Sequence, residues 1–241
     1  MRAAGRTAIV SGGSRGIGRA IAHRLSREGA NVVICALDTV RLESVASDIH
    51  SSSGGRVLPV VADVRVEAQV QECVRKALDN FGSVDILVNN AGVSRPAYLI
   101  DMGLNDWSAT LDANLTGAFL FARAVLPHMI EHRRGTIVNI GSRSGQQGYA
   151  RYAAYCASKF GLMGLTFALA QEVGRHGIRV NIVCPGEVDT DMNRASHPGI
   201  ADTSDWLQPE AVAEVVAYLV SDEATGIHGV SLNVFGQSRK P

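Results

Sequence analysis

The chain has 241 residues, 46% of them hydrophobic, and its 23 basic and 23 acidic side chains leave a formal net charge of zero. This balance gives no electrostatic reason to expect nucleic acid or an anionic membrane as a partner, and the apolar content argues against disorder. The N-terminus is a poor secretory signal, no window approaches the roughly 18 consecutive apolar residues of a membrane span, and the four cysteines form no CxxC pair, so we expect a cytoplasmic protein with free thiols.

Short β-branched runs alternate with longer helical segments along the whole chain. The runs are almost continuously apolar, as expected of parallel strands covered on both faces. The pattern predicts one domain over residues 1–241, an α/β fold with a doubly wound parallel sheet of about seven strands and right-handed crossovers. The expected strands are Thr7–Val10, Asn31–Cys35, Val57–Val61, Val84–Val88, Thr136–Ile140, Arg179–Val183 and Val230–Val234.

A glycine-rich loop follows the first expected strand. Its residues, Ser11-Gly12-Gly13-Ser14-Arg15-Gly16-Ile17-Gly18, lead directly into a helix. Glycines permit a tight turn and a close approach of backbone to ligand, and a helix N-terminus offers free N–H groups to a pyrophosphate. Glycines alone also fit a plain turn, but this position, after the first strand and before the first helix, favours dinucleotide binding in a Rossmann fold.

Three side chains with complementary proton chemistry lie in the second half of the chain. Ser142 follows the strand expected at 136–140, and Tyr155 and Lys159 are one helical turn apart, so they project from the same helix face. A phenol can donate a proton, a hydroxyl can hold a carbonyl oxygen, and an ammonium makes the phenol more acidic. The end of a strand and the start of a helix bring the three to one rim of the sheet, where such sheets bind ligands.

These motifs resemble the short-chain dehydrogenase/reductase family. The likeness includes Asn89-Asn90-Ala91-Gly92 and Pro185-Gly186, keeps the order of the family's motifs, and runs over nearly the whole chain. Within the family it is most similar to the 3-oxoacyl-(acyl-carrier-protein) reductases and related small carbonyl reductases. The resemblance implies hydride transfer between a nicotinamide cofactor and a carbonyl or secondary alcohol.

The resemblance also implies a role for each catalytic residue. Tyr155 acts as acid/base, Ser142 holds and stabilises the oxyanion, and Lys159 lowers the pKa of the phenol and binds the nicotinamide ribose. Asn114 holds a water that links Lys159 to solvent; the alternative is an asparagine that bends its own helix through a backbone hydrogen bond. A nucleophilic role for Ser142 is not expected, because no histidine base lies in a plausible motif near it.

The choice of nicotinamide cofactor depends on charge at the end of the second strand. The family's acidic position, which would bind the adenosine ribose, falls on neutral Ala36. Arg15 is placed to bind a 2′-phosphate, or else it is a solvated loop arginine. The resemblance therefore favours NADP(H), while NAD(H) stays possible because Leu37 is not basic and Asp38 can turn toward the ribose.

The resemblance extends to a longer set of cofactor-binding residues. Asp63 and Val64 are similar to the pair beside the adenine. The alternative for Asp63 is a cap on the helix that begins near Val66, and the alternative for Thr190 is a cap on the helix that follows Thr190. Asn89 is expected to tie neighbouring strands. The full set is Gly12, Ser14, Arg15, Gly16, Ile17, Gly18, Ala36, Asp63, Val64, Asn90, Ala91, Gly92, Tyr155, Lys159, Pro185, Gly186, Val188 and Thr190.

Other features of the sequence limit which metals, substrates and protein partners we expect. The seven histidines show no metal-ligand spacing, so we expect no metal. A short segment between Thr190 and Pro209 implies an open site that admits a small-molecule or carrier-bound carbonyl substrate. Small residues on the helices near 105–131 and 150–173 favour a homo-oligomer, a tetramer or dimer, although the ending Asn233-Val234-Phe235-Gly236-Gln237 departs from the family's acid and two glycines.

Three functions remain open from the sequence. The first is an NADP(H)-dependent carbonyl reductase, with a 3-oxoacyl thioester as the leading substrate. The second is an NAD-dependent dehydrogenase of a sugar, polyol or steroid. The third is a non-catalytic dinucleotide-binding redox sensor, against which the intact Asn114, Ser142, Tyr155 and Lys159 argue. The sequence does not identify the substrate, because specificity depends on the short lid and on the loop at 93–98, where Arg95 is either an anion-binding or a solvated arginine.

Overall fold

A seven-stranded, wholly parallel sheet forms the centre of the molecule in a computed structural model that describes residues 1–236. The strand order is β3-β2-β1-β4-β5-β6-β7, which confirms the predicted fold class. The last residue of the C-terminal motif, Gln237, lies outside the described residues. The strands are β1 (Thr7–Ser11), β2 (Asn31–Ala36), β3 (Val57–Val61), β4 (Ile86–Asn89), β5 (Gly135–Ile140), β6 (Ile178–Pro185) and β7 (Ser231–Val234).

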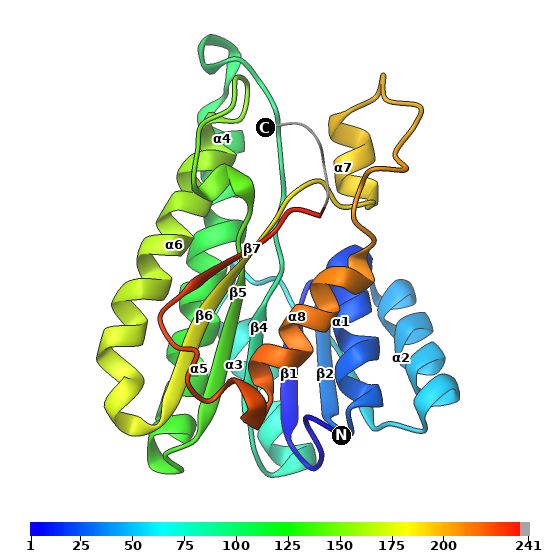
Figure 1. Ribbon diagram of the computed structural model, residues 1–241, viewed down its shortest axis with the longest axis vertical. Coiled ribbons are helices and arrows are strands. Elements are labelled where there is room, and N and C mark those ends of the chain that lie inside the picture. Colours follow the sequence, from blue (N-terminus) through cyan, green and yellow to red (C-terminus); the bar gives the residue numbers. More distant parts are fainter. Residues whose placement is uncertain (237–241) are drawn as a thin grey trace.

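Helices cover both faces of the sheet, as Figure 1 shows. One face packs against α1 (Gly16–Arg27), α2 (Thr39–Ser53) and α8 (Pro209–Val220). The other packs against α3 (Glu67–Phe81), α5 (Gly117–Glu131) and α6 (Ala153–Val173). Two shorter helices, α4 (Leu104–Leu111) and α7 (Asp191–Ser196), lie beyond the carboxyl ends of the strands.

The strand bounds differ from the predicted ones by at most two residues. The end of β6 differs by two residues, and so does the start of β4. The strand β4 begins at Ile86, two residues after the predicted start, because the side chain of Asp85 takes over part of the backbone pairing. The Asp85 carboxylate accepts a hydrogen bond from the Thr7 N–H at 2.9 Å and another from the Ser83 hydroxyl at 2.8 Å. A side chain that bonds the neighbouring backbone competes with a regular ladder, so the apolar run of the sequence overestimates the strand.

Local signals explain where several helices begin and end. Asp38 caps α2, since its carboxylate accepts a hydrogen bond from the Arg41 N–H at 3.0 Å. The helix ends at Gly54, whose φ of 66° is the left-handed conformation that glycine adopts without strain. The possibility that Asp63 caps α3 is wrong: Val66 occupies the cap position without a side-chain hydrogen bond.

The helix α6 is apolar for most of its length. The segment Ala153–His176 is long and apolar enough to cross a membrane by length and composition, although core helices pass the same test. Its Leu169, Ala170 and Val173 are buried against the sheet. Burial of one such large apolar side chain stabilises the fold by about 1.5–3 kcal/mol, so packing on the sheet accounts for the composition of this helix.

Candidate active site

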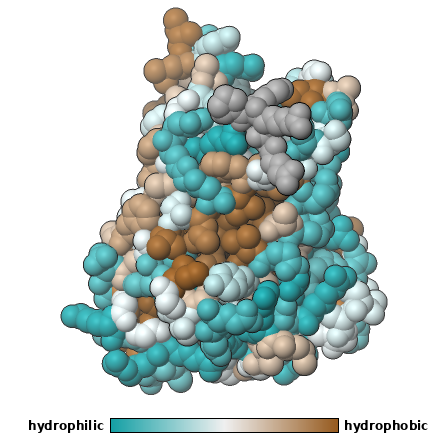
Figure 2. All heavy atoms as spheres, viewed as in Figure 1, coloured by the Kyte–Doolittle hydropathy of each residue, from teal (hydrophilic) through white to brown (hydrophobic). Residues whose placement is uncertain are grey.

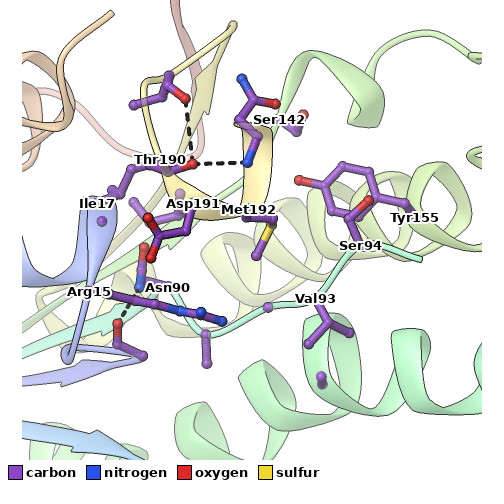
Figure 3. Close-up of a pocket in the computed structure, with 18 of the residues that line it drawn as sticks. Arg15, Ile17, Asn90, Val93, Ser94, Ser142, Tyr155, Thr190, Asp191 and Met192 are labelled. Atoms are coloured by element: carbon purple, nitrogen blue, oxygen red, sulfur yellow. Dashed lines mark hydrogen bonds between the residues drawn. The ribbon is translucent and has the colours of Figure 1, made fainter. Parts of the chain in front are cut away.

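A cavity of about 820 Å³ opens at the carboxyl end of the sheet. It lies where the strand order reverses between β1 and β4, the place where open α/β sheets bind ligands. Figure 3 shows part of its wall. Of the predicted site residues, all but Gly18 and Asn114 line this cavity: Gly12, Ser14, Arg15, Gly16, Ile17, Ala36, Asp63, Val64, Asn90, Ala91, Gly92, Ser142, Tyr155, Lys159, Pro185, Gly186, Val188 and Thr190.

The glycine loop leaves the N-terminus of α1 open toward the cavity. Gly12 and Gly16 have φ values of 65° and 51°, a region that other residues rarely adopt. Arg15, at the cap position, makes no side-chain hydrogen bond to the helix, so no side chain occupies the first N–H groups of α1. Free N–H groups at a helix N-terminus fit a pyrophosphate.

Gly18 acts behind this loop. A Cβ atom on Gly18 would lie 2.3 Å from the carbonyl oxygen of Gly12 and 2.4 Å from Nδ2 of Asn90. The same Asn90 amide donates hydrogen bonds to the carbonyl oxygens of Ser11 at 3.0 Å and Gly12 at 3.1 Å. Gly18 therefore permits close packing of α1 on the loop, and Asn90 holds the loop's shape.

Charged side chains line the end of the cavity near β2. The Asp38 carboxylate caps α2 and pairs with the guanidinium of Arg41, 3.2 Å from Nε. Arg65 donates to the Asp63 carboxylate, with Nη2 at 2.6 Å, and this hydrogen bond lowers the pKa of Asp63. Arg15 is exposed and its side chain makes no ion pair or hydrogen bond within residues 1–236. Among the residues that the structure describes, Arg15 is thus a cation in this region that no carboxylate holds.

Sequence reasoning missed Arg41. It lies one helical turn past the end of the loop that follows β2, and the first turn of α2 returns it to the mouth of the cavity. Its Nη1 lies 3.8 Å from the Asp191 carboxylate at the start of α7. The sequence around Arg41 does not indicate that its side chain lines the cavity, because this placement depends on the direction of α2 relative to the sheet.

Ser142, Tyr155 and Lys159 meet at the other end of the cavity. Tyr155 lies in the first turn of α6, and in Figure 3 its hydroxyl points into the cavity on the side of Ser142. The Lys159 ammonium lies 5.7 Å from the centroid of the Tyr155 ring. It is 4% exposed and donates a hydrogen bond to the carbonyl oxygen of Ile140 at 2.8 Å.

Burial controls the protonation of these groups. Desolvation raises the pKa of Tyr155 to about 12, and the nearby Ser142 hydroxyl acts in the opposite direction. Desolvation also lowers the pKa of Lys159 to about 8. Burial is the largest influence on the pKa of Tyr155 in this structure, and it acts against the acidification that is expected from Lys159. Tyr155 therefore carries its proton at neutral pH, as an acid for carbonyl reduction requires.

Asn114 lies behind the cavity wall, in a π-helical segment between α4 and α5. Its Oδ1 accepts a hydrogen bond from the Val93 N–H at 2.7 Å, and its Nδ2 donates to the Val93 carbonyl at 3.0 Å and the Ser158 hydroxyl at 3.0 Å. The side chain thus bonds other segments and not its own helix, against the alternative reading. A Cβ atom on Gly92 would lie 3.0 Å from Asn114 Oδ1 and 3.8 Å from Lys159 Nζ, so the two groups flank Gly92.

A second asparagine ties the strands below the site. Asn89 donates from Nδ2 to Oδ1 of Asn139 at 2.9 Å. Asn139 in turn donates to the Thr166 hydroxyl at 2.8 Å. These buried hydrogen bonds connect β4, β5 and α6, and they fix the helix that carries Tyr155 relative to the strand that precedes Ser142.

The short lid reaches over the cavity. Thr190 caps α7, because its hydroxyl accepts a hydrogen bond from the Asn193 N–H at 3.3 Å, and its Cγ2 would lie 3.1 Å from a Cβ on Gly16. It therefore caps the helix and also contacts the glycine loop. Figure 3 shows the Met192 side chain pointing down into the cavity toward Val93.

The loop opposite the lid carries polar groups. The Ser94 hydroxyl is buried without a hydrogen-bond partner in the described part of the chain, and Figure 3 shows it beside Tyr155. Arg95 forms an ion pair with Asp106 on α4. The Arg95 side chain is 53% exposed in this ion pair, so the structure favours the solvated arginine over the anion-binding one. No group of three or more metal-ligating side chains occurs within residues 1–236.

A glycine loop at the reversal point of a parallel sheet, with a protonated phenol, a serine and a lysine facing the same cavity, defines a nicotinamide-dinucleotide oxidoreductase site. The family model for short chain dehydrogenases matches residues 6–200. The chain therefore belongs to the short-chain dehydrogenase/reductase family. It is an oxidoreductase that acts on a carbonyl or secondary alcohol.

Curated relatives and solved structures agree with this assignment. The chain is 37% identical to a 3-oxoacyl-(acyl-carrier-protein) reductase from Chlamydia muridarum, with 96% of each chain covered. It is 38% identical to the Escherichia coli protein of that name, again with 96% coverage of both chains. Among solved structures, levodione reductase superposes with a TM-score of 0.92 at 31% identity and 97% coverage of both chains. An actinorhodin polyketide ketoreductase with NADPH has a TM-score of 0.90 at 36% identity and 96% coverage of both chains.

Proposed function

We propose that the protein reduces a 3-oxoacyl thioester, presented on a carrier, with NADPH as hydride donor. The observation that carries the proposal is the protonated Tyr155 hydroxyl beside Ser142, in one cavity with the open N-terminus of α1. The printed names of the similar reductases support the thioester, and the polyketide ketoreductase solved with NADPH supports the cofactor.

In this proposal the residues of the site divide the work of the reaction. Ser142 and Tyr155 hold the substrate carbonyl oxygen, and Tyr155 gives it a proton as negative charge develops there. The bound nicotinamide supplies the hydride. Lys159 sits one helical turn from Tyr155, and on leaving the Ile140 carbonyl it can bind a ribose hydroxyl and return a proton to Tyr155. Asn114, beside Lys159 and fixed by Val93 and Ser158, orients the path by which that proton arrives.

The cofactor preference is assigned to Arg15. Its guanidinium lines the cavity near neutral Ala36, and Asp38 is already bound to Arg41, so the charge in this region favours a 2′-phosphate over a bare ribose. We expect Arg15→Gln to raise the Kd for NADPH by about 10–100-fold, since a hydrogen bond between charged groups contributes about 1.5–3 kcal/mol. The Kd for NADH should stay within about threefold. Fluorescence titration of both cofactors measures this.

The matched control is Arg65→Gln, because Arg65 lines the same cavity but is held by Asp63. It should change the two affinities equally and little. Wild-type protein that binds NADH as tightly as NADPH would contradict the assignment.

Initial rates with a substrate panel test the proposed function. The panel compares 3-oxoacyl thioesters with sugars, polyols and steroids, and NADPH consumption or NADP⁺ reduction is followed by absorbance. We expect 3-oxoacyl thioesters to give the highest kcat/KM. Faster turnover of a sugar, polyol or steroid with NAD⁺ would replace the proposal with the second of the sequence-based functions.

We further propose a cytoplasmic homo-oligomer, a tetramer or a dimer. The four cysteines are buried and free, which suits a reducing compartment. Figure 2 shows an apolar patch over β7 and the adjoining part of α8, where Val230 is 37% exposed. Large apolar side chains of α5 and α6 are also exposed: Phe119, Ile130, Phe160 and Phe167. These apolar surfaces support the proposed contacts between subunits.

A further inference from the structure

Two of the arginines that line the cavity have no acidic partner in the described part of the chain. Five arginines line the cavity, and three are held by a carboxylate: Arg41 by Asp38, Arg65 by Asp63 and Arg95 by Asp106. Arg15 and Arg143 form no ion pair within residues 1–236. Arg15 is at the cofactor end of the cavity, whereas Arg143 follows Ser142 directly at the substrate end.

The backbone of Arg143 is held in place by the turn that follows β5. The Ser142 hydroxyl accepts a hydrogen bond from the Ser144 N–H at 3.1 Å. The carbonyl oxygen of Arg143 accepts one from the Gln146 N–H at 2.9 Å. Consecutive Cα atoms are about 3.8 Å apart. The side chain of Ser142, which holds the carbonyl oxygen, and the side chain of Arg143 therefore start from adjacent points of a fixed turn.

The side chain of Arg143 is also positioned. Its Cζ lies 4.4 Å from the centroid of the Phe235 ring, a cation–π contact. Its Nη2 lies 3.5 Å from the point where a Cβ on Gly186 would be, so the glycine leaves room for the guanidinium at this wall. An aromatic ring contacts the face of a guanidinium and leaves the N–H groups at its edge available for a carboxylate.

No acidic group of the same wall neutralises Arg143. Glu187 lines the cavity, but its carboxylate accepts a hydrogen bond from Nδ2 of Asn193 at 2.6 Å and forms no ion pair with Arg143. Asp189 is held by Arg194, with Nε at 2.6 Å from Oδ1. Within residues 1–236 the guanidinium therefore presents a positive charge that no carboxylate holds, in the cavity that Ser142 and Tyr155 also line.

We propose that Arg143 binds a carboxylate on the substrate, a few bonds from the reacting carbonyl carbon, so that the preferred substrates are ketones that carry a carboxylate. This inference rests on the proposed carbonyl reduction, and it narrows the substrate class to ketones, 3-oxoacyl thioesters included, whose chain carries a carboxylate. A neutral 3-oxoacyl chain would leave the guanidinium unused, whereas an oxo acid places one oxygen between Ser142 and Tyr155 and its carboxylate on Arg143.

Matched pairs of acid and ester test the inference. The substrates are acetoacetate with methyl acetoacetate, and levulinate with methyl levulinate, so that each pair differs only in the negative charge. We expect wild-type kcat/KM to be about tenfold or more higher for the acid of at least one pair. Arg143→Gln should lower the value for that acid by about 10–100-fold and leave the ester within about threefold, and Arg143→Lys should keep part of the preference.

The control variant is Arg95→Gln, which removes an arginine of the same cavity that already has a partner. It should not change the ratio of acid to ester, and turnover of the esters shows that each variant is folded. An equal ratio in the wild type and in Arg143→Gln would overturn the inference and leave carbonyl reduction intact.

The proposed function fails separately if neither these ketones nor 3-oxoacyl thioesters are reduced. In that case, calorimetry of levulinate binding to the protein with NADPH tests whether Arg143 binds a carboxylate. Binding that is lost in Arg143→Gln supports the inference. Absent binding, or equal binding by the wild type and the variant, refutes it.

Discussion

Replacing Tyr155 with phenylalanine is expected to lower kcat for carbonyl reduction by about 10²–10⁴-fold, the usual contribution of a positioned general acid. The ring would still fill its place in the first turn of α6, so only the proton donor is lost. Because burial raises the pKa of Tyr155 to about 12, the wild-type enzyme should keep its acid protonated across the neutral range, and the rate of reduction should not fall with pH below about 10 through this group.

Stopped-flow rates of NADPH oxidation and fluorescence titration of NADPH separate the two effects. The Kd of the cofactor should stay within about threefold in the variant, since phenylalanine keeps the ring and removes at most one neutral hydrogen bond. Ser142→Ala should lower kcat less than Tyr155→Phe, because it removes a hydrogen bond and not the proton. Wild-type turnover by Tyr155→Phe would remove Tyr155 from the chemistry and, with it, the proposed mechanism.

Replacing Lys159 with methionine should abolish most turnover and at the same time stabilise the protein. Burial lowers the pKa of Lys159 from 10.5 to about 8, and such a shift corresponds to about 3 kcal/mol of destabilisation at neutral pH. The variant loses the hydrogen bond to the Ile140 carbonyl, which contributes about 1 kcal/mol. We therefore expect the free energy of unfolding at pH 7, without added nucleotide, to rise by about 2 kcal/mol.

The pH dependence of the free energy of unfolding tests this prediction separately. Between about pH 8 and 10.5 the unfolded chain binds more protons at Lys159 than the folded chain does, so stability should increase with pH in this window. Above about pH 10 the raised pKa of Tyr155 acts in the opposite direction, and stability should fall as the pH approaches 12. Urea titrations at pH 7 and 9.5 measure both proteins.

The gain of stability between these pH values should be absent in Lys159→Met. The conservative variant Lys159→Arg keeps the charge and should show no stabilisation. A methionine variant that is less stable than the wild type at pH 7 would show that the ammonium is satisfied by its surroundings and that its pKa is not depressed.

The sheet could be predicted more completely than the contacts of the site residues. Each predicted strand occurs in the structure, because uninterrupted β-branched runs such as the one before Ser142 leave the backbone few alternatives. The predicted start of β4 is two residues early. There the side chain of Asp85 bonds the backbone of Thr7, a contact between segments far apart in the chain. The sequence left two roles for Asp63, a contact beside the adenine and a helix cap. In the structure Asp63 pairs with Arg65 and does not cap the helix, because of the conformation of the turn after β3.

The candidate site shows the same division. The spacing of Tyr155 and Lys159 predicts a shared helix face from covalent geometry alone, and the glycine loop predicts its own turn. The direction of the Lys159 ammonium toward Ile140, and the pKa values that follow from burial, depend on how α6 packs on the sheet.

The chain's local patterns thus specify the parallel sheet, the glycine turn and the placement of the proton donor, since each of these is set by the geometry of residues close in sequence. The packing of distant elements specifies which charges stay available. Arg41, Arg65 and Arg95 are held by carboxylates, whereas Arg15 and Arg143 have none within residues 1–236. Whether a guanidinium meets an acid depends on distances of a few ångströms between separate elements, and no spacing along the chain encodes them.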